Sequence, residues 1–143
     1  MRPVIFLVLF FFNCGLLFGQ SIFGKWKTID DKSGIEKAVV EIYEYEGLVY
    51  GKVVEILEQG RENELCTKCK GDDKNKPIVG IKVIKGLKFN GKDEYKGGRL
   101  FDPEYGVEVR GKIWLQPKNK DKLMVRGYLA FLYRTQTWLR VKD

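Results

Sequence analysis

The chain of 143 residues contains no histidine, and its only serines are Ser21 and Ser33. Without histidine it cannot build a Ser–His–Asp or Cys–His arrangement for nucleophilic catalysis. No glycine-rich loop that could cradle phosphate precedes a helical pattern, and carboxylate pairs such as Asp72–Asp73 lie in polar loop sequence. We therefore expect a non-enzymatic protein with no catalytic residues. An enzyme that uses interior carboxylates is the weakest alternative.

Cysteine is also scarce: there are three, and Cys66 and Cys69 lie close together in a charged, turn-rich segment. A structural zinc site usually needs four nitrogen or sulfur ligands, and this pair has only carboxylates such as Asp72 to complete one. We expect no metal and no cofactor. A redox pair usually opens a helix after a strand, whereas the flanking sequence here has loop character. In an oxidising compartment the pair is expected to form a disulfide, with redox exchange or an ion shared between two chains as alternatives.

The N-terminus carries a short apolar run, residues 4–18, after a single basic residue, Arg2. A membrane-spanning helix needs roughly 20 apolar residues, so this shorter run predicts a secretory signal peptide over residues 1–20, cut near Gly19–Gln20. An uncleaved anchor, or lipidation of Cys14, would be alternatives. We expect an exported protein, periplasmic or secreted, with no stable membrane span after cleavage.

The charge of the chain gives little indication of a partner. A net charge of +7 falls to +6 when Arg2 leaves with the first twenty residues, and the lysines form no basic block. Such a surface is typical of a solvated protein, so we expect no nucleic-acid partner; oligomeric state is left open. Residues 21–143 are enough for a single domain with one modest core.

The remaining sequence alternates between short β-rich runs and turn signals, without a sustained helical period. Two turn sequences are clear, "NGKD" at residues 90–93 and "DPEYG" at 102–106. The predicted strands cover residues 21–29, 37–45, 48–57, 78–89, 94–101, 107–115, 123–130 and 133–141.

Eight consecutive antiparallel strands predict an all-β, up-and-down barrel, because closure removes the exposed edges of the sheet. A flattened sandwich is the alternative. The interior of an eight-stranded barrel is filled by side chains or holds one small ligand. The polar segment 58–77, which carries both cysteines, is a candidate lid over one end of the barrel.

Several sequence blocks resemble one known family. They are "GKW" at 24–26, "YGKVVEI" at 50–56, "CTKCKG" at 66–71, "GGRLFDPEYG" at 97–106, "VRGY" at 125–128 and "TQTWLRV" at 135–141. Together they resemble the uncharacterised bacterial family called domain of unknown function 2147, which implies an exported bacterial protein but no activity. Gly24 and Trp26 also give a looser resemblance to lipocalin-like barrels, in which a late arginine, here Arg140 or Arg126, packs over the tryptophan.

A set of arginine and aromatic residues on the predicted strands is the candidate binding site. Its members are Trp26, Arg99, Arg110, Arg126, Tyr128, Trp138 and Arg140. Strand alternation places Arg110 opposite Val109, but the period alone does not fix which face points inward. If the arginines point inward, they could clamp an anionic ligand. The interpretation we favour is that they point outward and cover exposed aromatic rings.

From these observations we predict a protein that binds a small anionic or amphipathic molecule, or a partner, outside the cytoplasm. A structural or interaction module of the cell envelope without a pocket is the main alternative. An open, partly polar cavity inside the barrel would favour the first function, and a solid apolar core would favour the second.

Overall fold

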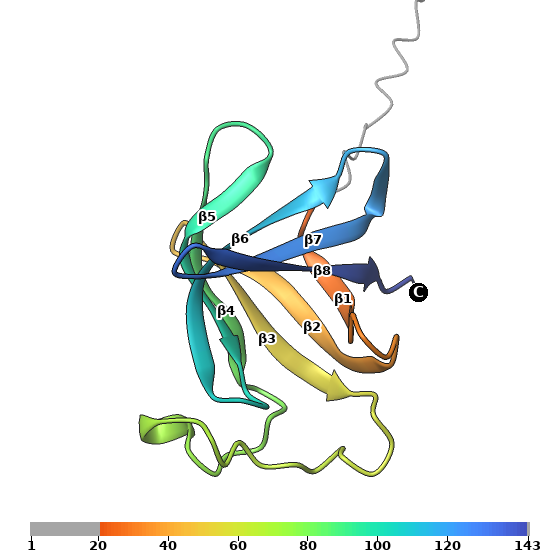
Figure 1. Cartoon of the computed structure of the whole chain (residues 1–143), viewed down its shortest axis with the longest axis vertical. Helices are drawn as coiled ribbons and strands as arrows, with labels where there is room; N and C mark the ends of the chain where they lie inside the picture. The colour runs from red at the N-terminus through yellow and green to blue at the C-terminus, as the bar shows by residue number, and fades with distance from the viewer. Residues whose placement is uncertain (1–20, 143) are drawn as a thin grey trace, which may run out of the picture.

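Eight antiparallel strands form the structure, a computed structural model that describes residues 21–142 (Figure 1). The predicted signal peptide, residues 1–20, lies outside the described residues. The strands are β1 (Gly24–Ile29), β2 (Glu36–Tyr45), β3 (Leu48–Ile56), β4 (Lys82–Phe89), β5 (Glu94–Asp102), β6 (Val107–Gln116), β7 (Asn119–Leu129) and β8 (Leu132–Arg140).

The strands follow one another around a closed barrel, and β8 returns to pair with β1. This last pairing joins Trp26 to Arg140 and Lys27 to Leu139. The predicted up-and-down barrel is confirmed, and the sandwich is wrong. Each strand in residues 21–142 therefore has a hydrogen-bonded neighbour on both sides.

The largest differences from the sequence prediction are at the starts of two strands, each displaced by four residues. β7 begins at Asn119, four residues earlier than expected, because Asn119 already pairs with Gln116 across a tight turn. β4 begins at Lys82 because the Ile78 N–H donates to Glu64 outside the sheet, and the Gly80 N–H reaches Val53 of β3 only at an irregular part of the ladder. In both places the local hydrogen bonding, which the apolar pattern does not report, sets the boundary.

The two ends of the barrel differ. At one end, which we call the closed end, lie the turns β2–β3, β4–β5 and β6–β7. Large inward side chains that are at most 1% exposed pack there; they are Trp26, Ile42, Ile84, Leu87, Ile113 and Leu123. The other end, which we call the mouth, carries the β1–β2, β5–β6 and β7–β8 connections.

Glycines on the inward face leave room for large side chains of the adjacent strand. A Cβ atom at Gly51 would lie 3.0 Å from Ile84 Cδ1, and one at Gly111 would collide with the side chain of Leu100. Glycine inside a strand is typical of such close approaches. The side chains of Ile84 and Leu100 therefore pack directly over the backbone of the neighbouring strand.

Trp26 and Arg140 pack against each other at the closed end of the barrel. The Arg140 guanidinium carbon lies 4.3 Å from the centre of the Trp26 ring, and its Nη2 donates to the carbonyl oxygens of Ser21 and Lys120 at 2.9 Å each. The indole Nε1 of Trp26 donates to the Ile22 carbonyl at 2.8 Å. Arg140 is thus the arginine over this tryptophan.

The long segment between β3 and β4, residues 57–81, lies at the mouth end and is the yellow-green loop at the bottom of Figure 1. A disulfide joins Cys66 to Cys69, and both residues are buried. The Cys66 N–H donates to the Lys76 carbonyl at 2.7 Å, which folds the segment back on itself. Its 3₁₀ turn, η1 (Gly71–Asp73), is three residues long.

This segment is fixed to the β5–β6 turn. Gly106 adopts a positive φ, and a Cβ atom there would lie 2.7 Å from the Lys68 carbonyl oxygen, so the two backbones touch. Lys68 Nζ also lies 5.7 Å from the centre of the Tyr105 ring. Within residues 21–142, no helix is long and apolar enough to cross a membrane.

Replacing Arg140 with glutamine should lower the free energy of unfolding by about 1–3 kcal/mol, because the cation over Trp26 and its hydrogen bonds are lost together. Urea denaturation measures the change. Arg110→Gln, on the exposed outer face of β6, is the matched control and should change the value by less than about 0.5 kcal/mol. Equal effects of the two substitutions would contradict a special role for Arg140 in closure.

Candidate functional site

A cavity of about 590 Å³ occupies the mouth half of the barrel. Most of its wall is apolar, and six consecutive strands, β2 to β7, contribute inward side chains to it. The wall residues include Ala38, Val40, Val53, Ile56, Val83, Leu100, Val109, Val125 and Gly127. The volume falls within the range of about 300–1,000 Å³ that is usual for small-molecule sites.

On two strands, β2 and β7, the inward side chains become smaller toward the mouth, which leaves space for the cavity. On β2 the inward series runs from Ile42 through Val40 to Ala38, and on β7 Gly127 follows Val125. A Cβ atom at Gly127 would lie 3.0 Å from Val109 Cγ2, so its absence leaves room at the wall. The sequence therefore fills one half of the barrel and leaves the other half open.

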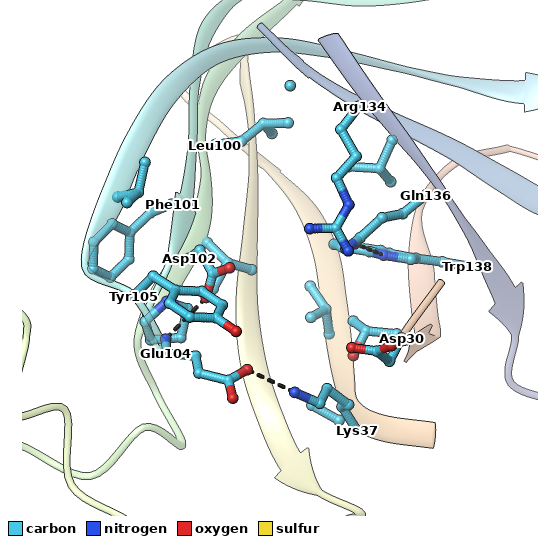
Figure 2. A pocket seen from close by; sticks show the side chains of 18 of the residues that line it. Asp30, Lys37, Leu100, Phe101, Asp102, Glu104, Tyr105, Arg134, Gln136 and Trp138 are labelled. Atoms are coloured by element: carbon cyan, nitrogen blue, oxygen red, sulfur yellow. Dashed lines mark hydrogen bonds and ion pairs between the residues drawn. The ribbon is translucent and has the colours of Figure 1, made fainter. Parts of the chain in front are cut away.

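One wall of the cavity is polar. β8 directs Arg134, Gln136 and Trp138 inward at alternate positions, as Figure 2 shows. Trp138 Nε1 donates to Gln136 Oε1 at 3.1 Å. Because an indole nitrogen can only donate, this bond fixes the orientation of the Gln136 amide and turns its NH₂ group away from Trp138.

Asp31, in the β1–β2 connection, holds Arg134 at the mouth. Arg134 Nε donates to Asp31 Oδ2 at 2.8 Å, and Nη2 donates to Asp31 Oδ1. The hydrogen bonds from Arg134 lower the pKa of the Asp31 carboxyl below its ordinary value. This arrangement uses two of the three guanidinium nitrogens and leaves Nη1 without a partner among the described residues.

A second group of ion pairs attaches the 57–81 segment to the charged residues around the mouth. We call these residues the rim: Asp31, Lys37, Glu104 and Arg134. Lys37 Nζ lies 2.6 Å from Glu104 Oε2, and Arg61 lies 2.6 Å from Glu64, 3.1 Å from Glu58 and 3.7 Å from Glu104. The bond to Glu104 raises the pKa of Lys37, and Arg61 lowers the pKa of Glu64. The predicted lid segment thus forms one side of the mouth through Glu58, Arg61, Glu64 and Ile78.

Acidic side chains outnumber basic ones around the cavity. The lining cations are Lys32, Lys37, Arg61 and Arg134, and the lining acids are Asp30, Glu58, Glu64, Asp102 and Glu104. Asp31, bonded to Arg134, adds a sixth carboxylate at the mouth. The local balance is therefore opposite in sign to the positive net charge of the whole chain.

Four of the seven residues predicted as a binding site lie inside the barrel or at its mouth. Trp138 lines the cavity and is 6% exposed, and Tyr128 lies at the mouth. Trp26 and Arg140 lie at the closed end, where they belong to the packing rather than to the cavity lining.

The other three predicted residues lie on the outer surface. Arg99 and Arg110 are exposed cross-strand neighbours on β5 and β6. Arg126 packs over two rings, 5.0 Å from the centre of Trp114 and 4.4 Å from that of Tyr133. Because neighbours such as Ile113 and Val125 are buried, alternation turns these arginines outward, and the structure does not gather them around the cavity.

Sequence reasoning missed the rim residues. Lys37 and Glu104 are 67 positions apart, and Asp31 and Arg134 are 103 positions apart, so no local pattern links them. One signal was available: every one of these charges lies beside a predicted turn at the same end of the barrel. Within residues 21–142, no three His, Cys, Asp or Glu side chains are arranged to hold a metal ion.

The stability of the protein should be constant between pH 6 and 8 and fall below about pH 4. Histidine is absent, and partners lower the pKa of Asp31 and Glu64. A lowered carboxyl pKa stabilises the fold above the unfolded-state pKa, and this contribution is lost as the pH falls through the folded-state value. Urea midpoints measured from pH 3 to pH 8 test the expectation.

Glu64→Gln should cost about 0.5–1 kcal/mol at pH 7 and much less at pH 3, because its partner Arg61 is partly exposed to solvent. Glu46→Gln, in the exposed β2–β3 turn, is the control and should show no such difference. A change in the stability of the wild type between pH 6 and 8 would contradict the constant stability expected in that range.

The fold of the chain is similar to one solved structure, described as "Protein HP1028 from the human pathogen Helicobacter pylori belongs to the lipocalin family". The two align with a TM-score of 0.74 and 19% sequence identity, over 87% of this chain and 86% of that one. At this identity the likeness shows a shared lipocalin-like fold. A search of curated proteins finds no match. A family model described as "Uncharacterized protein conserved in bacteria (DUF2147)" matches residues 24–140, and the chain therefore belongs to this family.

Proposed function

We propose that this protein is a non-enzymatic, exported binder of a small amphipathic molecule. One observation carries the proposal: the barrel is filled at one end and open at the other, with a cavity of about 590 Å³. A barrel with only a structural role would be expected to fill its interior, because unfilled apolar space costs stability. The solved lipocalin-like structure supports the same function by analogy of fold.

The lining of the cavity supports an amphipathic ligand. An apolar chain would lie against the valine and leucine walls, where each buried methylene contributes about 0.8 kcal/mol. A polar end would meet Arg134 and Gln136 on β8. This division between an apolar interior and a few convergent polar groups is typical of small-molecule sites.

The electrostatics of the site support binding rather than catalysis. No polar or charged residue among residues 21–142 is fully buried. The mouth carboxyls with displaced titration, Asp30, Asp31 and Glu64, all have a lowered pKa, Asp30 through backbone N–H groups and the other two through arginines. A general acid needs the opposite displacement at neutral pH, so these groups suit fixed charges.

A second candidate function, docking of a partner, is favoured by the β7–β8 hairpin tip. Phe131 is 92% exposed, and Leu129, Leu132 and Tyr133 are each more than 60% exposed. Large apolar residues grouped on a surface often mark an interaction site. The tip lies at the mouth, so partner docking and ligand binding would take place at the same end of the barrel.

The neutral fluorescent probe N-phenyl-1-naphthylamine should bind to the chain of residues 21–143 with a rise in its fluorescence and energy transfer from Trp138. Ala38→Phe should weaken binding roughly tenfold or more, because the new ring occupies the cavity. Fluorescence titration measures both effects.

Glu41→Phe, on the outer face of the same strand, is the matched control and should leave the affinity unchanged. Urea midpoints show whether each variant remains folded. If a folded wild type does not bind the probe, or if Ala38→Phe and Glu41→Phe have equal effects, cavity binding is wrong.

A further inference from the structure

Resting on the proposed function, we propose that the cavity selects uncharged amphipathic molecules whose polar end carries acceptor oxygens, and that it discriminates against carboxylates because Asp31 neutralises Arg134. The ligand class would include esters and acylglycerols rather than free fatty acids. Asp31 would act as a specificity-determining residue from outside the cavity lining.

The donors available at the polar wall favour acceptor oxygens in a ligand. Gln136 gives its Oε1 to the indole of Trp138, so its NH₂ group is the part left to face the cavity. Arg134 gives Nε and Nη2 to Asp31, so Nη1 is left as a second donor, and Figure 2 shows its guanidinium group directed into the cavity. Both groups lie on β8 at alternate positions. A carbonyl or ester oxygen could accept from both.

The charge around these donors disfavours an anion. Asp31 bonds the Arg134 guanidinium through both of its carboxylate oxygens, which cancels the charge that would otherwise attract a carboxylate. Of the other lining cations, Lys37 is paired with Glu104 and Arg61 with Glu58, Glu64 and Glu104, whereas Lys32 lies exposed to solvent in the β1–β2 connection, away from the β8 donors in sequence. At the β8 donors a carboxylate would lose its hydration without gaining an unmatched positive partner.

Displacement of N-phenyl-1-naphthylamine at pH 8 tests the inference with two lipids of equal chain length, monododecanoylglycerol and dodecanoate. Monododecanoylglycerol should displace the probe at a concentration at least about tenfold lower, because the ionised head group pays the larger desolvation cost. Both lipids are used below the concentrations at which they form micelles.

Asp31→Asn should reverse much of this preference by releasing the Arg134 charge. We expect dodecanoate to gain about fivefold or more in affinity and monododecanoylglycerol to change little. Asp93→Asn makes the same change in net charge in the β4–β5 turn at the closed end, and it should alter neither lipid. The pair of variants separates the local effect of Asp31 from the net charge of the protein.

Arg134→Met should weaken monododecanoylglycerol about three- to tenfold, the loss expected for one hydrogen bond, once the displacement is corrected for the affinity of the variant for the probe. Urea midpoints confirm that the variants are folded. Dodecanoate binding as tightly as the glyceride in the wild type would overturn the inference, as would equal effects of Asp31→Asn and Asp93→Asn.

The failures of the two proposals are distinguishable. If the probe binds but neither lipid displaces it, the head-group selectivity is wrong and cavity binding stands. If the probe itself does not bind to folded protein, the proposed function is wrong and the selectivity falls with it.

Discussion

The pairing of β1 with β8 is the constraint on which the rest of the structure depends. β1 has six residues, and only Trp26 and Lys27 pair with β8. Arg140 reinforces this short seam by packing on the Trp26 ring and bonding the backbone on either side. Because the sheet is closed, every strand has an inner and an outer face, and the apolar side chains of an alternating strand point to the inner one.

Once the barrel is closed, the size of the inward side chains determines which part of its interior is filled and which part is open to a ligand. Tryptophan, isoleucine and leucine fill the end held by Trp26, whereas alanine, valine and glycine line the end formed by the β1–β2 and β5–β6 connections. The same strands thus supply both a stabilising core and an open space. The rim residues lie in or beside the connections between strands. They therefore add charged groups at the mouth without placing a charge among the apolar side chains packed at the closed end.

Local features of the sequence were enough to predict the strands, the turns and the closed barrel. The "DPEYG" turn and the alternation around Ile113 depend on neighbouring residues, and the structure agrees with both. The site was harder to predict, because it depends on contacts between distant positions. Lys37 meets Glu104 and Asp31 meets Arg134 only after closure. The predicted arginines Arg99, Arg110 and Arg126 share a strand face, but alternation alone could not show that it was the outer one.

The disulfide joins two cysteines only three positions apart, so it stiffens the 57–81 segment without linking that segment covalently to any strand. The backbone hydrogen bonds and ion pairs that attach the segment to the rim are all reversible. Reduction of Cys66 and Cys69 would therefore loosen the 57–81 segment at the mouth, while the strands of the barrel and the β1–β8 pairing stayed in place.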